Sequence, residues 1–124
     1  MKIEVSNGEI VDKLTIIEIK LANITDAQKL VNLQCEYEIL NQAVGSLVQK
    51  DHPLYQELLE INKKLWNIED RIRELEKIKD FGDEFVQVAR AVYFTNDLRS
   101  DVKRRINLLT NSSLVEEKSY EEYS

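Results

Sequence analysis

One long heptad repeat in the middle of the chain constrains the fold more than any other feature of the sequence. Between Pro53 and Lys79, apolar residues recur at steps of four and three. They are Leu54, Leu58, Ile61, Leu65, Ile68, Ile72 and Leu75. A seam with this period is typical of a helix that packs lengthwise against other helices, as in a coiled coil. We therefore expect a long helix here and a fold built from long helices.

The composition also favours an all-α fold. Of the 124 residues, 43% are hydrophobic and 32% are charged, and only three are Gly and one is Pro. Such a composition disfavours both a turn-rich β fold and disorder. A chain of this length buries a single core, so one domain is expected.

Periodic apolar patterns predict an elongated antiparallel bundle of three to four long helices, with a short extended N-terminus. The expected helices cover residues 7–24, 26–49, 53–80 and 83–109. A break near residues 23–26 separates the first two, and one continuous helix is the alternative. The bundle domain spans residues 1–109. An acidic tail, residues 110–124, follows the bundle. We expect it to dock either on the basic end of the last helix or on a second subunit.

Polar residues at the predicted helix ends suggest specific caps. Ser6 and Glu9 have the spacing of a capping box. Thr25 is expected to cap the second helix and Asp51 the third. Gly82 is expected to supply a left-handed turn after the third helix. In the first helix, the apolar seam leaves Asp12 and Thr15 on the flanks and outer face.

The charge pattern argues against nucleic acid as a partner. The net charge is −6, whereas binding to phosphates needs clustered cations. One basic run is present and consists of Arg99, Lys103, Arg104 and Arg105. A basic helix C-terminus also complements the helix dipole. We therefore do not expect the chain to bind nucleic acid.

No metal, cofactor or membrane segment is expected. His52 is the only His, and Cys35 is the only Cys and falls in a helical pattern, where a buried thiol is expected. The N-terminus lacks the apolar core of a signal peptide, and no apolar run is long enough to span a membrane. The cytoplasm is the predicted compartment.

The last predicted helix carries polar residues where its seam should be apolar. Thr95 and Arg99 occupy two such positions. In one interpretation they belong to a pocket that binds a small anion, with Glu18 or Glu69 as acid or base. The anion-binding candidates are Lys13, Arg73, Arg90 and Arg99. In the other interpretation the same charges form a salt-bridge layer that fixes helix register.

Trp66 lies one step outside the long seam, beside Leu59. A Trp in this position widens the core face or fills an interface, so both residues are interface candidates. A helix of about 26 residues spans roughly 39 Å, which leaves seam area for a second copy to cover. The leading hypothesis is a non-enzymatic helical interaction or assembly protein that acts as a homodimer, with a larger protein as a further partner. The alternative is a binder of, or an enzyme acting on, a small anionic metabolite.

Four stretches resemble a family of small bacterial all-helical proteins with no established activity. They are EVSNGEIVDKLTIIEIK, INKKLWNIEDRIRELE, ARAVYFTNDLRSDVKRRIN and EEKSY. They cover most of the chain in order. The resemblance implies a helical fold with these boundaries and assigns no catalytic residue.

Overall fold

The computed structural model describes residues 1–115 and 117, and in this part of the chain it is an all-α bundle, as predicted. The four helices are α1 (Asn7–Asn23), α2 (Ala27–Gly45), α3 (Pro53–Lys77) and α4 (Asp83–Leu109). The described residues contain no β-strand. They also contain no helix whose length and apolar character would let it cross a membrane.

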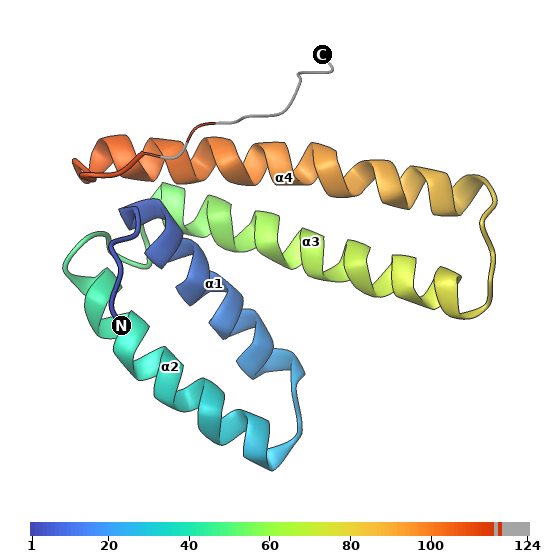
Figure 1. Ribbon diagram of the computed structural model, residues 1–124, viewed down its shortest axis with the longest axis horizontal. Helices are drawn as coiled ribbons and strands as arrows, with labels where there is room; N and C mark the ends of the chain where they lie inside the picture. The colour runs from blue at the N-terminus through green and yellow to red at the C-terminus, as the bar shows by residue number, and fades with distance from the viewer. Residues whose placement is uncertain (116, 118–124) are drawn as a thin grey trace.

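The helices form two antiparallel hairpins that meet at one end and diverge at the other (Figure 1). The first hairpin is α1 with α2, and the second is α3 with α4. Among the four helices, α1 alone lies against all three others. The centre of the fold is therefore α1, and not the longer α3 that dominates the sequence pattern.

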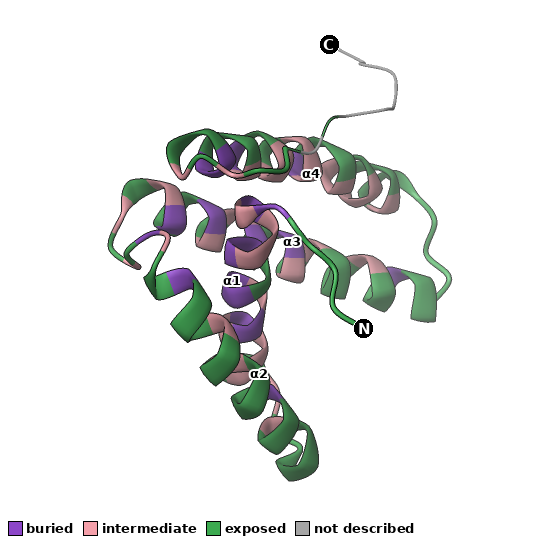
Figure 2. Cartoon of the chain, turned by 60° about the vertical axis from the view of Figure 1, so that its left-hand side comes forward, coloured by how far each residue is buried: buried purple, intermediate pink, exposed green. Residues whose placement is uncertain are grey.

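The central position of α1 follows from its apolar residues, which are not confined to one face. Val11, Leu14, Ile17 and Ile19 are all buried and point in different directions around the helix. The main core cluster takes residues from every helix and from the turn after α2: Val11, Leu14, Val44, Val48, Tyr55, Leu58, Val102 and Ile106. Figure 2 shows buried positions along α1, whereas most of α2 is exposed.

The first two helices are separate, but the caps differ from the predicted ones. Asp26, and not Thr25, caps α2, and its Oδ1 accepts a hydrogen bond from the main-chain N–H of Lys29 at 2.9 Å. His52, and not Asp51, caps α3 through its Nδ1. Both caps satisfy an N–H group that has no partner inside the helix.

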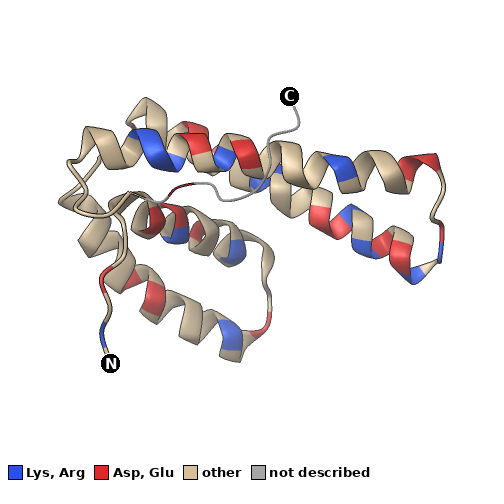
Figure 3. Ribbon diagram, turned by 45° about the horizontal axis from the view of Figure 1, so that its top comes forward, with Lys and Arg blue, Asp and Glu red and all other residues tan. Residues whose placement is uncertain are grey.

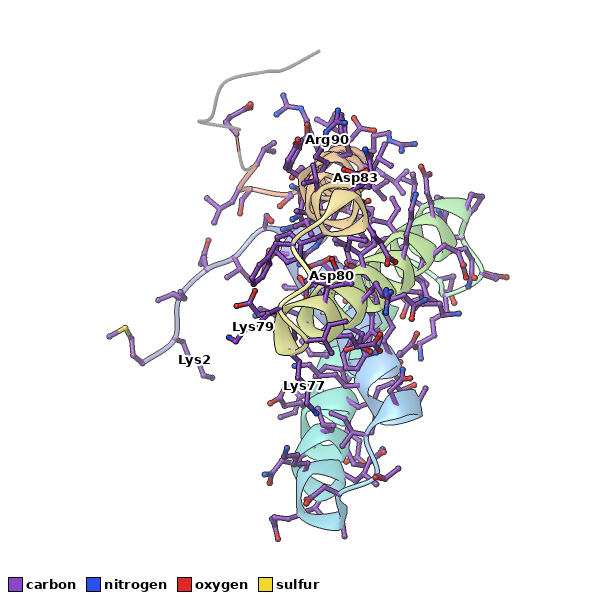
Figure 4. All side chains as sticks on the ribbon, turned by 90° about the vertical axis from the view of Figure 1, so that its right-hand side faces the viewer. Lys2, Lys77, Lys79, Asp80, Asp83 and Arg90 are labelled. Carbon is purple, nitrogen blue, oxygen red and sulfur yellow. The ribbon has the colours of Figure 1, made fainter. Side chains whose placement is uncertain are left out.

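The helix ends also differ from the predicted ones. α2 ends at Gly45 rather than near residue 49, and α3 ends at Lys77 rather than near residue 80. The left-handed residue after α3 is Lys79, with φ 56°, whereas Gly82 has φ −77°. Figure 4 views this turn end-on, with Lys79 and Asp80 at the tip of the α3–α4 hairpin.

Residues beyond α4 turn back toward the helix. Asn111 has φ 53°, which reverses the chain direction. Glu117 then accepts a hydrogen bond from Arg104 at 2.6 Å. This contact joins one residue of the acidic tail to one residue of the basic run, and the docking of the tail stays a prediction. The other tail residues, with most of the EEKSY motif, lie outside the described residues.

Candidate functional site

A buried polar network joins α1, α3 and α4, and its centre is the carboxylate of Asp12. This side chain is fully buried. Its Oδ1 accepts hydrogen bonds from Asn62 Nδ2 and from Arg99 Nε, each at 2.9 Å. Its Oδ2 accepts a second hydrogen bond from the Arg99 guanidinium, so the pair is bidentate. Asn62 also donates to Thr15 Oγ1 at 2.8 Å. Four side chains therefore connect three helices.

The charges of this network balance each other. The hydrogen bonds with Asp12 raise the pKa of Arg99 above its ordinary value, even though burial acts in the opposite direction. The nearby carboxylates of Glu9 and Glu69 raise this pKa further. Glu9 itself lies 2.6 Å from Lys103 Nζ and 3.9 Å from Lys13 Nζ. The layer thus consists of cations that already have carboxylate partners.

The start of α1 is held by side chains from the end of α4 and the residues after it. The amide of Gly8 donates to Asn107 Oδ1 at 2.6 Å, and the amide of Asn7 donates to Ser112 Oγ at 3.0 Å. A Cβ at Gly8 would come within 3.0 Å of the main-chain oxygen of Lys103. Only glycine therefore lets α1 approach α4 this closely.

A second polar cluster lies beside α1, where α2 and the start of α3 approach it. Lys50 Nζ lies 2.9 Å from Glu18 Oε1 and donates to the Tyr37 hydroxyl at 2.5 Å. Burial lowers the pKa of Lys50, but its bonds to Tyr37 and Glu18 outweigh burial and raise that pKa overall. The adjacent Tyr55 hydroxyl is buried, and no group in the described chain meets it with full hydrogen-bond geometry, although the Glu18 carboxylate lies close to it. Burial, with the nearby Glu18 carboxylate, raises the pKa of Tyr55.

A groove of about 410 Å³ lies between α1 and α3. Its walls combine apolar and polar side chains: Glu18, Ile19, Ala22, Asn23, Leu59, Lys63, Trp66 and Asn67. The two residues predicted to contact a partner, Trp66 and Leu59, thus line one groove together with the proposed acid or base Glu18.

The predicted anion-binding residues do not gather at one place. Arg90 and Arg99 are nine residues apart on α4, which places them on opposite sides of a helix with 3.6 residues per turn. Figure 4 shows Arg90 on the outer side of α4, and its guanidinium lies 5.6 Å from the centre of the Phe94 ring. Arg73 is exposed on α3, and Lys13 is exposed beside Glu9.

The sequence patterns missed two members of the polar network, namely Asp12 and Thr15. Both were expected on the flanks and outer face of the first helix, but both are buried. One signal pointed to this result. Val11, Ile16 and Ile19 are apolar residues outside the predicted seam, and apolar residues on several sides indicate a helix that is surrounded.

The surface carries further differences from expectation. Cys35 is exposed on α2, so the predicted buried thiol is wrong. Within residues 1–115 and 117, no group of three or more His, Cys, Asp or Glu side chains is placed to hold a metal ion.

The described chain is thus a small all-α protein in which two helical hairpins are joined through a central first helix. More specifically, the chain belongs to a family of unknown function, DUF6165, whose model matches residues 1–123. No curated protein and no solved structure matches the chain.

Proposed function

We propose that this chain is a non-enzymatic helical assembly protein that acts as a homodimer. The observation that carries the proposal is the number of large apolar side chains exposed on the outer faces of α2 and α4. Large exposed apolar surfaces are rare on monomeric proteins, and where they occur they mark interaction sites. The predicted cytoplasmic location is part of the proposal.

The outer face of α4 illustrates the exposed apolar surface. Leu98 is 53% exposed and Leu108 is 62% exposed, although both are large aliphatic residues. Other exposed apolar residues on this helix are Val86, Tyr93, Phe94 and Leu109. They alternate with charged residues such as Arg90 and Asp101, a residue type that is depleted in the cores of protein interfaces.

The balanced polar layer supports a structural role over catalysis. Arg99 is held by Asp12, and Lys103 is held by Glu9. An anion that replaced Asp12 as the bidentate partner of Arg99 would leave the buried Asp12 carboxylate unpaired, which is costly. The layer therefore fits the role of fixing how α1, α3 and α4 pack.

The test of the proposal is the mass of the full chain in solution. Sedimentation velocity and size exclusion with light scattering should give a dimer at micromolar concentration that dissociates on dilution. A monomer at every micromolar concentration would reject the homodimer.

The prediction that Trp66 and Leu59 contact a partner stays a prediction.

The alternative function, binding or conversion of a small anionic metabolite, has one supporting observation. The groove beside Glu18 and Trp66 has a volume of about 410 Å³, within the range of small-molecule sites. Dicarboxylates and phosphorylated compounds should then raise the melting temperature of the wild-type chain. Trp66 is the only Trp, so its fluorescence would report occupancy of the groove directly.

A further inference from the structure

The outer face of α2 carries a stripe of apolar side chains on the side opposite its contact with α1. Val31, Cys35 and Ile39 recur at steps of four residues, which places them in one row along the helix. Val31 is 58% exposed, Ile39 is 71% exposed, and Cys35 is also exposed. The inner face is formed by other residues, among them Leu33 and Val44, which are buried. The packing of the single chain therefore gives no reason for the apolar character of the outer row.

α2 is also poor in charge for a helix with so much exposed surface. Its 19 residues include only three charged ones, Lys29, Glu36 and Glu38. The 25 residues of α3 include eleven, although α3 has more buried positions. In Figure 3, α2 is mostly tan, whereas blue and red bands follow one another closely along the half of α3 nearest the α3–α4 turn. An apolar centre with few charges around it is typical of an interface core, whereas a helix face in contact with water carries more charged residues.

We propose that the outer face of α2 is the homodimer interface, and that a second copy packs its own α2 antiparallel against it. The two-fold axis passes beside Cys35. This inference rests on the proposed function, because it assigns the surface through which the proposed dimer forms. In this arrangement Val31 meets Ile39 of the partner subunit, and the reverse contact follows by symmetry.

The charges decide between the two directions in which the helices can pack. In a parallel pair, Glu38 faces Glu38 of the partner subunit, which is unfavourable. In the antiparallel pair centred on Cys35, Glu38 faces Asn32 of the partner subunit, and Gln28 faces Gln42 of the partner subunit. Carboxylate–amide and amide–amide pairs can form hydrogen bonds across the interface. The face is therefore self-complementary only in the antiparallel direction.

The size of this surface sets the expected strength of the dimer. A helix of 19 residues is about 28 Å long, and a single helix pair lies at the small end of specific interfaces. The dissociation constant of the dimer should therefore lie in the micromolar range, so the dimer dissociates on dilution below that range. Dimerisation through α2 leaves the α1–α3 groove open, so dilution should leave the fluorescence spectrum of Trp66 unchanged.

The first experiment compares two matched substitutions by sedimentation velocity on the full chain. Ile39→Glu places a charge in the proposed interface, and Val86→Glu makes the same kind of change at an exposed site on α4. Ile39→Glu should weaken the dimer at least about tenfold, whereas Val86→Glu should leave it unchanged. Circular dichroism should show the wild-type helix content in both variants, since both sites are exposed.

The second experiment tests the direction of packing through disulfide formation. Under mild oxidation the wild-type chain should form a Cys35–Cys35 dimer, because the two Cα atoms lie close enough for a bridge. In a Cys35→Ser background, chains with Gln28→Cys and chains with Gln42→Cys should cross-link to each other. Each of them alone should not cross-link.

The outcomes separate this inference from the proposed function. A wild-type dimer that Val86→Glu disrupts and Ile39→Glu does not would place the interface on α4 and overturn the inference, while the homodimer remains. Self-cross-linking of Gln28→Cys chains would overturn the antiparallel arrangement. A wild-type monomer throughout would reject both the homodimer and this interface.

Discussion

The carboxylate of Asp12 and the guanidinium of Arg99 form a bidentate ion pair between α1 and α4, although the two residues are 87 positions apart in the sequence. The two partners differ in exposure: the Asp12 side chain is 1% exposed, whereas that of Arg99 is 28% exposed. Removing one partner should therefore not have the same effect as removing the other. This asymmetry provides a test of whether the layer is structural.

Arg99→Leu should destabilise the fold by about 3–5 kcal/mol, because it leaves a fully buried carboxylate without its cation. Asp12→Asn should cost less, about 1–3 kcal/mol, because Arg99 keeps some contact with water. Urea denaturation at neutral pH measures both. A melting temperature for Arg99→Leu that equals or exceeds the wild-type value would indicate that the layer is kept for a ligand.

The glycines at positions 8 and 45 offer a matched pair of substitutions. Gly8→Ala should destabilise the fold by about 1–3 kcal/mol, because a Cβ there collides with the backbone of α4. Gly45 is also helical, but a Cβ there meets nothing within 4 Å. Gly45→Ala should instead stabilise by about 0.4–1 kcal/mol. Equal effects at the two sites would contradict the close approach of α1 to α4.

The fold class was predictable from the sequence because helical periodicity is local. The seam of α3 from Leu54 to Leu75 and the break between α1 and α2 both rest on residues close together in the chain. The N-cap at Ser6 is also confirmed, because the main-chain N–H of Glu9 donates to Ser6 Oγ at 3.2 Å. The Glu9 carboxylate, the other half of the predicted capping box, lies 2.6 Å from Lys103 Nζ.

The polar network was less predictable because its members meet only through tertiary packing. The break at Thr95 and Arg99 did indicate a polar layer in α4, but the partner expected for Arg99 was Glu69 or Glu18. The observed partner, Asp12, looks like a surface residue when α1 is read as having one buried face. That reading failed because α1 packs against three helices and is buried on most sides.

Lys79 should be a site of stored backbone strain. It adopts φ 56° after α3, in the region where residues with a Cβ pay a steric penalty. Lys79→Gly should therefore stabilise the fold by about 0.5–1 kcal/mol, as measured by the urea midpoint. Lys79→Ala is the control, since it removes the charge and keeps the Cβ. A gain from alanine as large as the gain from glycine would attribute the effect to the charge.

Tyr55 should control how stability changes at alkaline pH. Burial raises the pKa of Tyr55 in the folded chain, whereas the unfolded chain ionises near the ordinary tyrosine value of about 10. Below that pH the contribution of this group is constant, and above it the unfolded state gains the tyrosinate form, so stability falls. Tyr55→Phe removes a buried hydroxyl that no group in the described chain meets with full hydrogen-bond geometry. At neutral pH it should stabilise the fold by about 1 kcal/mol, and above pH 10 it should reduce the loss of stability.

The measurement for Tyr55 is the free energy of unfolding in urea at several pH values from neutral to alkaline. Tyr93→Phe, which alters a ring on the exposed face of α4, is the matched control and should keep the wild-type alkaline fall. If Tyr55→Phe destabilises the chain at neutral pH, its hydroxyl has a partner in solution, and the nearby Glu18 carboxylate is the group to test. Adding Glu18→Gln to Tyr55→Phe then gives a double-mutant cycle, and a coupling energy near zero would leave burial alone as the cause of the raised pKa.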